Sequence, residues 1–359
     1  MDREVLLSVR NLQQYFKMGR RELKAVDNVS FDIYKGEVFG LVGESGCGKT
    51  TTGRSIIRLY DITGGSVYYK GRRICAGTRS YKDAIKQARK DFAEKKITKE
   101  QRDQIIADNR AEIKKATEDH EKWSRTKSKS QLTNEIQMIF QDPIASLDPR
   151  MTVRDIIAEG LIIRGEKNKE YIDSQVYKIL ETVGLVQEHA SRYPHEFSGG
   201  QRQRIGIARA VVMNPELIIA DEPISALDVS IQAQVINLLN ELSRKMGLTI
   251  MFIAHDLAVV KYFSNRIAVM YFGKIVELGT SDELFAHPFH PYTRSLLSAI
   301  PLPDPITEKS RKRIEYDPVL DHDYSRETPT MREVYPGHFV LCNTEEYEKY
   351  LREYEETAK

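Results

Sequence analysis

The chain has 359 residues and an almost balanced charge, with 54 Lys and Arg against 52 Asp and Glu. A formal net charge of +2 argues against a dedicated nucleic-acid binder, so no nucleic-acid partner is expected. No apolar run approaches the roughly 18–20 residues that span a bilayer, and three cysteines suit a reducing compartment. The polar start, Met1 to Glu4, lacks the apolar segment of a signal peptide.

A short apolar segment at 38–42 predicts a strand, and the sequence GESGCGKT follows it directly at 43–50. The spacing G-x-x-x-x-G-K-T predicts a loop whose backbone N–H groups surround a nucleotide phosphate, at the start of a helix running to Leu59. We expect Lys49 to reach the β- and γ-phosphates and Thr50 to ligate Mg²⁺. We assign no chemical role to the side chain of Cys47, because the backbone of the loop binds the phosphate. The predicted nucleotide-binding residues here are Gly43, Glu44, Ser45, Gly46, Cys47, Gly48, Lys49, Thr50 and Thr51.

A charged segment of about sixty residues separates the predicted strands at 65–69 and 136–140, and apolar residues recur in it at heptad spacing. Thr98 and Gln101 have the spacing of a helix capping box. We therefore predict an antiparallel helical hairpin over 76–133, with Ile97 near its tip. Two functions remain open for it: a decoration that packs on itself, or a contact with a partner subunit. The heptad positions are Tyr81, Ile85, Ala88 and Phe92, then Ile106, Asn109, Ile113, Ala116, His120 and Trp123.

Two acidic residues, Asp221 and Glu222, follow a wholly apolar segment at 217–220. Such a segment indicates a strand buried on both faces of a parallel sheet, and ligands bind where such strands end. Asp221 is then placed to hold Mg²⁺, and Glu222 to act as general base toward water. An Asp-Glu pair after a strand is common by itself. The phosphate loop makes the functional interpretation the better one.

Taken with FSGGQ at 197–201, these motifs resemble the nucleotide-binding subunits of ATP-binding-cassette (ABC) transporters over Leu6 to Pro303. The resemblance implies that Phe16 stacks on adenine, with Tyr15 as the alternative. It implies that Gln141 contacts Mg²⁺ and faces the membrane subunit, and that His255 contacts the γ-phosphate. The implied catalytic residues are Glu222, His255, Gln141 and Lys49, and the implied metal ligands are Thr50, Gln141 and Asp221.

In that family two cassettes pack head to tail with two ATP molecules between them. The resemblance therefore implies that Ser198, Gly199, Gly200 and Gln201 bind the nucleotide of the partner, together with Asp228 in the sequence SALD. Phe197 stands where Leu is usual, which is an apolar replacement. The chemistry is positioning and electrostatic stabilisation, without a covalent intermediate. The implied cofactors are ATP and Mg²⁺.

The implied fold is an α/β ABC nucleotide-binding domain, with a RecA-like core, an antiparallel β subdomain and an α-helical subdomain. We predict the ATPase domain at 1–287, including the hairpin at 76–133 and the helical subdomain at 145–204. A C-terminal extension then occupies 288–359. Its part beyond Pro303 is charged and irregular, which predicts either a small regulatory lobe or a partly disordered strap.

Two segments, 141–150 and 287–301, resemble the oligopeptide/dipeptide/nickel importer branch, although Asp148 stands where Asn is usual. That branch implies a second, non-identical cassette, two multi-spanning permease subunits and an extracytoplasmic peptide-binding protein. The expected location is the cytoplasmic face of the membrane. Nickel or another small solute remains an alternative cargo, and a soluble cassette acting on ribosomes or chromosomes is a more distant alternative.

Members of this branch often carry a four-cysteine iron–sulfur cluster in the tail. Only Cys342 lies in the matching segment here, and Cys47 and Cys75 are far upstream. Three cysteines exclude such a cluster within this chain. Cys342 is interpreted as a small hydrophobic residue.

Overall fold

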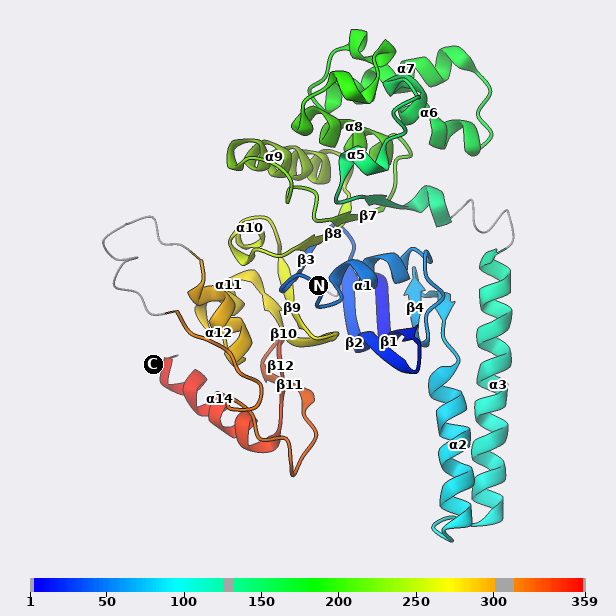
Figure 1. Cartoon of the computed structure of the whole chain (residues 1–359), viewed down its shortest axis with the longest axis vertical. Helices are drawn as coiled ribbons and strands as arrows, with labels where there is room; N and C mark the ends of the chain where they lie inside the picture. Colours follow the sequence, from blue (N-terminus) through cyan, green and yellow to red (C-terminus); the bar gives the residue numbers. More distant parts are fainter. Residues whose placement is uncertain (1–2, 125–131, 301–312, 358–359) are drawn as a thin grey trace.

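Two β-sheets and a group of helices form the scaffold (Figure 1). The structure, a computed structural model, describes residues 3–124, 132–300 and 313–357. Across these ranges, no helix is both long enough and apolar enough to cross a membrane. The strands are β1 (Val5–Met18), β2 (Arg21–Tyr34), β3 (Val38–Val42), β4 (Gly64–Tyr69), β5 (Arg72–Ala76), β6 (Ile136–Ile139), β7 (Leu217–Asp221), β8 (Thr249–Ala254), β9 (Arg266–Tyr271), β10 (Lys274–Thr280), β11 (Thr330–Tyr335) and β12 (His338–Cys342).

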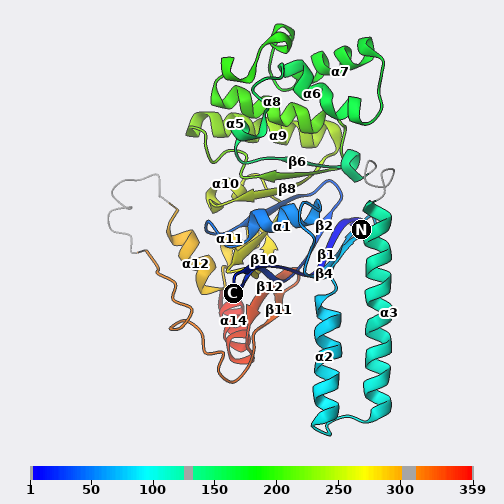
Figure 2. The same ribbon diagram turned by 45° about the vertical axis from the view of Figure 1, so that its right-hand side comes forward.

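The helices cover the larger sheet and form the two projecting parts of the molecule (Figures 1 and 2). They are α1 (Lys49–Ile56), α2 (Arg79–Ala93), α3 (Lys99–Ser124), α5 (Pro143–Ser146), α6 (Val153–Ile163), α7 (Lys169–Thr182), α8 (Gly199–Val211), α9 (Val229–Met246), α10 (Leu257–Lys261), α11 (Ser281–Ala286), α12 (Pro291–Ser298) and α14 (Thr344–Thr357), with 3₁₀ turns η1 (Gln187–Ser191) and η2 (Pro194–Glu196).

The larger sheet has eight strands in the order β11-β12-β10-β9-β3-β8-β7-β6, and its central strands are parallel. Both faces of this sheet are buried. In β3, Val38 and Val42 belong to one core cluster, whereas Phe39 and Leu41 belong to the other. The prediction of doubly buried strands from unbroken apolar segments is therefore confirmed.

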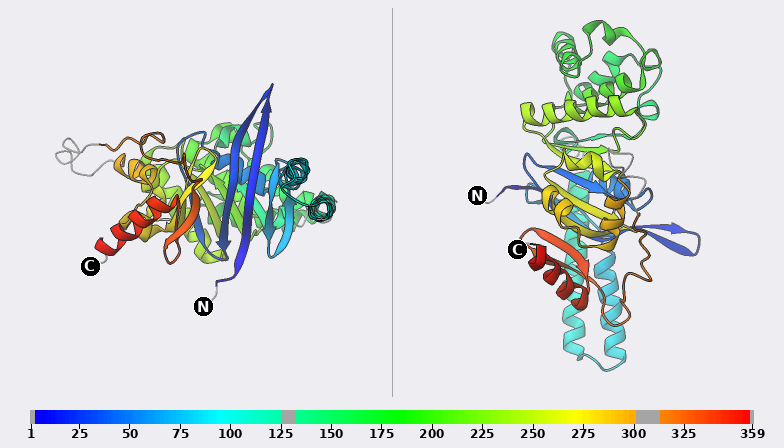
Figure 3. Two further views of the ribbon diagram at one scale, coloured as in Figure 1. Left: turned by 90° about the horizontal axis from the view of Figure 1, so that it is seen from below. Right: turned by 90° about the vertical axis from the view of Figure 1, so that its left-hand side faces the viewer.

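The smaller sheet is antiparallel, in the order β2-β1-β4-β5, and it packs on the face of the larger sheet that carries Phe39 and Leu41. Strands β1 and β2 form a long ribbon (Figure 3, left). Phe16 lies toward the end of this ribbon, paired with Leu23.

The opposite core cluster joins the larger sheet to helices α6, α7 and α8. These helices stand together at one end of the molecule (Figures 1 and 2). Helix α8 begins at Gly199 and continues to Val211, beyond the residue at which the sequence placed the end of the helical subdomain. The division of the chain into subdomains stays a prediction.

The inserted segment forms the predicted helical pair, α2 and α3, which lie side by side and project from the molecule (Figures 1 and 3). Ala88 of α2 and Ala116 of α3 are buried, as the heptad pattern predicts. The capping box is also present: the Gln101 N–H donates to Thr98 Oγ1 at 3.2 Å, and the Thr98 N–H donates to Gln101 Oε1 at 2.8 Å. Ile97 lies in the turn that joins the helices.

The base of the hairpin is anchored more firmly than its sequence suggests. Arg73 of β5 is only 8% exposed and pairs with two carboxylates of α3, Asp119 at 2.7 Å and Glu112 at 3.6 Å. Trp123 and Leu132 belong to the core cluster of the antiparallel sheet. Removing the whole insertion would therefore remove part of that core.

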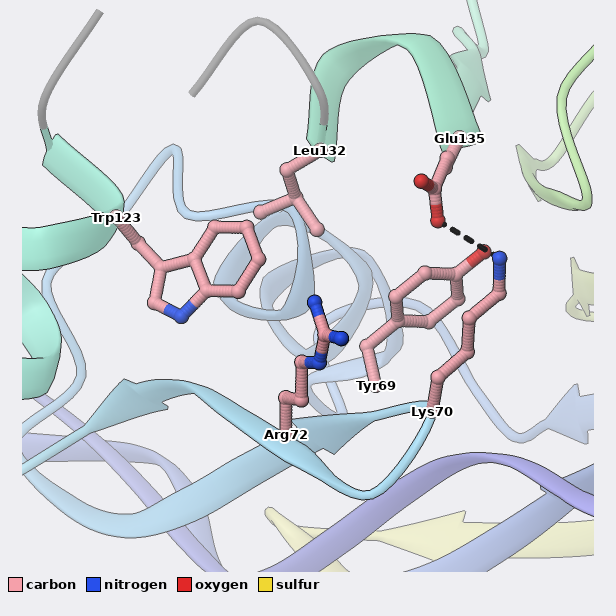
Figure 4. A pocket seen from close by; sticks show the side chains of 6 residues that line it. All are labelled: Tyr69, Lys70, Arg72, Trp123, Leu132 and Glu135. Carbon is pink, nitrogen blue, oxygen red and sulfur yellow. Dashed lines mark hydrogen bonds and ion pairs between the residues drawn. The ribbon is translucent and has the colours of Figure 1, made fainter. Parts of the chain in front are cut away.

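A small pocket lies at this base, lined by aromatic, charged and apolar side chains (Figure 4). Inside it Lys70 donates to Glu135 at 2.9 Å. None of the predicted nucleotide-binding residues lines the pocket. Its lining residues are Tyr69, Lys70, Arg72, Trp123, Leu132 and Glu135.

The C-terminal extension continues the larger sheet. Strand β12 pairs antiparallel with β10, so that Val340 lies opposite Glu277, and β11 pairs with β12. Helix α14 packs on this pair through Tyr350, next to Phe289 and the buried, unpaired Cys342. Strands β11 and β12 and helix α14 thus form a folded lobe, and a regulatory role for it stays a prediction. Residues 301–312 lie outside the described part of the chain.

Candidate functional site

The loop after β3 has the backbone that a phosphate site requires. Gly43, Gly46 and Gly48 have φ values of 151°, 84° and 108°, in the region that side chains disfavour. A Cβ on Gly43 would lie 2.1 Å from the Met270 carbonyl oxygen, and one on Gly48 would lie 2.1 Å from that of Ala25. Only glycine fits at either position. Gly48 is the N-cap of α1, so the loop ends at a helix N-terminus that attracts anions.

Lys49 lies across this loop and is 3% exposed. Its ammonium donates to the carbonyl oxygens of Gly43 at 2.7 Å and Glu44 at 2.9 Å, and lies 3.9 Å from Glu222 Oε1. These internal partners hold the cation over the loop. A nucleotide phosphate would offer it a stronger, charged acceptor at the same place.

Asp221 ends β7 beneath the loop and is fully buried. Its Oδ1 accepts the Thr50 hydroxyl at 2.7 Å, and burial raises the pKa of its carboxyl. Its Oδ2 has no hydrogen-bond partner in the described part of the chain, with the Arg54 guanidinium 3.9 Å away. A buried carboxylate oxygen beside a hydroxyl fits Mg²⁺, which prefers oxygen ligands and completes its shell with water and phosphate.

Glu222 is the point on which three predicted catalytic residues converge. Its carboxylate accepts Gln141 Nε2 at 2.9 Å, lies 3.5 Å from His255 Nδ1 and 3.9 Å from Lys49. Its φ of 44° is rare for a residue with a side chain, and its N–H is fixed by the Ile253 carbonyl at 3.0 Å. Strands β6, β7, β8 and the loop after β3 thus bring residues distant in sequence around one carboxylate.

The FSGGQ segment is placed differently. Ser198 caps α8: its Oγ accepts the Gln201 N–H at 3.3 Å, and Gln201 Oε1 accepts the Ser198 N–H at 3.0 Å. A Cβ on Gly200 would lie 2.6 Å from the Ile231 side chain. Ser198 and Gly199 are exposed. Figures 1 and 2 show α8 among the helices at one end of the molecule, away from α1 and its phosphate loop.

Asp228 lies beside this exposed helix start. It is the N-cap residue of α9, its side chain makes no capping bond, and it is exposed together with Val229. The side chain of Leu227, one residue earlier, packs against Gly199. The two segments expected to meet a second cassette therefore share one surface.

The two candidates for the adenine platform differ in their surroundings. Tyr15 donates its hydroxyl to Asp27, and its ring lies beneath the Arg79 guanidinium at 5.0 Å. Phe16 is half-buried and meets Tyr60 edge-on, with ring centroids 5.3 Å apart. Because Tyr15 is engaged in polar contacts, Phe16 remains the preferred residue. Its role stays a prediction.

Sequence reasoning missed two residues that contact the site. Arg54 lies one turn after Thr50 on α1 and approaches Asp221, and its helical spacing was a usable signal. Tyr292, in the C-terminal extension, accepts the Glu44 N–H at its hydroxyl at 3.0 Å. The segment around it resembled one importer branch, but nothing in the sequence linked it to the phosphate loop.

Comparison with known proteins identifies the family. The family model described as "ABC transporter" matches residues 26–225, and that of the "Oligopeptide/dipeptide transporter, C-terminal region" matches 276–323. The chain is 54% identical to the oligopeptide transport ATP-binding protein OppF of Bacillus subtilis, over 97% of this chain and 99% of that protein. It is 48% identical to the dipeptide transport ATP-binding protein DppF of Lactococcus lactis, over 97% of each.

Solved structures share the fold. The ATP-binding cassette MJ0796, in a dimeric post-hydrolysis state bound to ADP and Pi, has a TM-score of 0.57 and 24% identity, over 77% of this chain and 99% of that one. CbiO1 from Clostridium perfringens, part of the ABC transporter complex CbiONQ, has a TM-score of 0.59 and 22% identity, over 79% and 91%. With a nearly full-length relative at 54% identity and a family model that matches more than half of the chain, this protein belongs to the ABC transporter family.

Proposed function

We propose that this chain is the ATP-hydrolysing subunit of an importer of oligopeptides or dipeptides. The observation that carries the proposal is the convergence of Lys49, Gln141 and His255 on the carboxylate of Glu222, at the mouth of a glycine-rich phosphate loop. The cargo follows from relatives named as oligopeptide and dipeptide transport ATP-binding proteins, which align over nearly the whole chain.

The residues have distinct roles in hydrolysis. The loop N–H groups and Lys49 bind the phosphates, and Phe16 stacks on adenine. Glu222 accepts a proton from the attacking water, while His255 contacts the γ-phosphate. Thr50, Asp221 and Gln141 would hold Mg²⁺, which neutralises charge on the phosphate oxygens when it is bound.

A second, non-identical cassette completes each nucleotide site. The partner cassette would contribute its own helix start, equivalent to the one at Ser198, to the nucleotide bound by this chain. In return, Ser198 and Asp228 of this chain would contact the nucleotide bound by the partner. The support is geometric. Ser198 caps α8, which lies among the helices at one end of the molecule, whereas Lys49 begins α1, which lies away from them (Figure 2). A single chain therefore leaves the outer side of its nucleotide uncovered.

The helical end also offers an apolar surface for membrane subunits. Ile144, three residues after Gln141, is 64% exposed, and Ile163 on α6 is 74% exposed. Contiguous exposed apolar patches mark interaction sites, and these two isoleucines are our candidates for such a patch. We place two multi-spanning permease subunits here, which hold the chain at the cytoplasmic face of the membrane. An extracytoplasmic peptide-binding protein would deliver the cargo.

Reconstitution tests the proposal. The chain is co-purified from its native membrane with its associated subunits, placed in proteoliposomes, and supplied with labelled peptide or with nickel in separate assays. We expect ATP-dependent uptake of peptide, lost with Glu222→Gln. If only nickel were taken up, the assigned cargo would change from peptide to nickel, and the assigned ATPase activity would stand. Recovery of the chain with ribosomal or chromosomal proteins, without permease subunits, would refute the importer function.

A further inference from the structure

The C-terminal extension reaches the phosphate loop through one buried tyrosine. Tyr292, the second residue of α12, is 2% exposed and accepts the Glu44 N–H at its hydroxyl oxygen at 3.0 Å. Burial raises the pKa of this hydroxyl above its usual value, so it stays protonated and uncharged. The contact joins residues 248 positions apart in the sequence.

Buried polar groups fix the position of Tyr292. The Tyr292 N–H donates to His290 Nδ1 at 3.1 Å, which caps α12. The N–H groups of Phe289 and His290 donate to the Glu277 carboxylate at 2.9 and 3.0 Å. His338 Nε2 lies 2.8 Å from the same carboxylate, and both side chains are at most 1% exposed. This chain of contacts runs from β12 of the extension, through β10, to the phosphate loop.

The tyrosine ring is held as firmly as its backbone. The rings of Tyr271 and Tyr316 lie 4.5 and 5.5 Å from it between centroids. Tyr271 directly follows Met270, whose carbonyl oxygen occupies the space in which a Gly43 side chain would lie. The hydroxyl of Tyr292 is therefore presented to Glu44 from a rigid aromatic cluster.

Glu44 has few other constraints. Glu44 is exposed, and its carbonyl oxygen accepts hydrogen bonds from Lys49 Nζ at 2.9 Å and from the Cys47 N–H at 3.3 Å. The first of these bonds is exchanged when Lys49 turns toward nucleotide phosphates. The hydrogen bond from the Glu44 N–H to Tyr292 uses neither Lys49 nor a phosphate, so it can hold this end of the loop in its binding conformation before a nucleotide arrives.

We propose that Tyr292 is a positioning residue of the nucleotide site: its hydroxyl fixes the Glu44 end of the phosphate loop, and through it the C-terminal extension sets the affinity for nucleotide phosphates. The proposal deepens the proposed function and rests on it, because it requires the loop to bind ATP. Replacing Tyr292 by Phe removes one neutral hydrogen bond and leaves the Glu44 N–H without this acceptor. We therefore expect the affinity for ATP to fall by about 3- to 10-fold.

The test compares Tyr292→Phe with Tyr350→Phe in the full chain. Tyr350 is a matched control because it is 3% exposed in the same extension but packs on Phe289, far from the loop in sequence and contacts. ATP affinity is measured by titration without Mg²⁺. We expect about 3- to 10-fold weaker binding for Tyr292→Phe and no change for Tyr350→Phe. In the assembled transporter the KM for ATP should rise by a similar factor, with kcat within about twofold.

A second readout does not depend on ATP. Cys47 lies in the loop and is 7% exposed, so a looser loop should speed its alkylation by iodoacetamide, measured peptide by peptide. Cys75 and Cys342, also buried, serve as internal controls. We expect faster alkylation of Cys47 alone in Tyr292→Phe, with a melting temperature lowered by no more than a few degrees.

The outcomes separate the two proposals. If the unaltered chain fails to bind ATP, the proposed function fails and the role of Tyr292 with it. If it binds ATP but Tyr292→Phe matches it in both affinity and Cys47 alkylation, only the role of Tyr292 is refuted. Should Tyr292→Phe not fold, hydrogen exchange of the unaltered chain decides: the Glu44 amide should exchange more slowly than those of Ser45 and Gly46, and equal rates would overturn the proposal.

Discussion

The inserted hairpin and the C-terminal extension are both additions to the cassette, yet they are joined to it in different ways. They lie on opposite sides of the molecule (Figures 1 and 3). The hairpin is attached at its base, through Arg73 and Trp123, and its two helices otherwise pack on each other. The extension adds strands to the central sheet and contacts the phosphate loop.

The difference lies in where each addition buries its polar groups. His338 of the extension and Glu277 of β10 are enclosed, and a buried pair is costly to break. Most ion pairs of the hairpin are exposed, such as Lys114 with Glu118, and such pairs contribute little to stability. A change in the extension should therefore reach the nucleotide site, whereas a change at the hairpin tip should stay local.

Glu222→Gln is expected to have the largest effect on ATP turnover, against which the effects of changes in the hairpin and the extension are compared. Removing the general base should lower ATP turnover by about 10²- to 10⁴-fold while leaving ATP binding intact, so that the paired cassettes stay closed. Phosphate release and nucleotide-dependent pairing on a sizing column measure the two effects. Turnover at the normal rate would refute the role assigned to Glu222.

Trp123→Ala tests whether the hairpin base belongs to the core. Trp123 is 7% exposed, and truncating a buried tryptophan destabilises by about 3–5 kcal/mol. Phe92→Ala, near the hairpin tip where the ring is 36% exposed, is the control and should cost far less. Urea unfolding gives both values. Equal small effects would mean that the whole hairpin is a surface attachment.

The extension should respond to pH through His290. Burial, with help from nearby His322 and Arg294, lowers the pKa of His290 from 6.5 to about 3. Between these values the unfolded chain binds a proton that the folded chain excludes, so stability falls as the pH drops below 6.5. The loss is about 1.4 kcal/mol per pH unit, or about 2 kcal/mol at pH 5.

His290→Asn is the matched variant for this pH effect. Asparagine can still cap α12, but it does not titrate. Unfolding free energies measured at pH 7 and pH 5 should differ less in the variant, because the asparagine that replaces His290 does not titrate. An unchanged difference would assign the pH dependence to other groups.

Shortening the hairpin should have the smallest effect. Residues 86–108 form its distal part, and a short glycine-containing turn can join Ile85 to Asn109, which face each other across the seam according to the heptad register. Arg73, Trp123 and their partners are kept. We expect ATP affinity within about twofold of the unaltered chain, because residues 86–108 make only contacts local to the hairpin within the described part of the chain. A large loss of nucleotide binding would contradict the comparison.

Much of the candidate site could be predicted from the sequence because each motif is local. The glycines at 43, 46 and 48 need a left-handed backbone, Ser198 and Gln201 cap one helix start, and Thr98 and Gln101 cap another. In each case the residues involved lie within a few positions of one another. Spacing alone then fixes the geometry.

The contacts that escaped prediction join distant segments. Tyr292 meets Glu44, Arg73 meets Asp119, and Trp123 enters the core of the antiparallel sheet. The tail also looked irregular, yet β12 pairs with β10 across a long connection. The charged residues around these strands concealed this pairing. β11 mixes apolar and charged residues, and the apolar segment of β12 covers only 339–342, which does not indicate its partner strand.

The sequence by itself therefore determined the family, the phosphate loop, the acidic strand end and the helical nature of the insertion. These follow from hydrogen bonds and side-chain periodicity over a few residues, which the chain specifies directly. Only the tertiary structure decided that Gln141, His255 and Lys49 meet at Glu222 and that the extension touches the loop. The order of strands in the central sheet sets those distances, and that order depends on the packing of the whole domain.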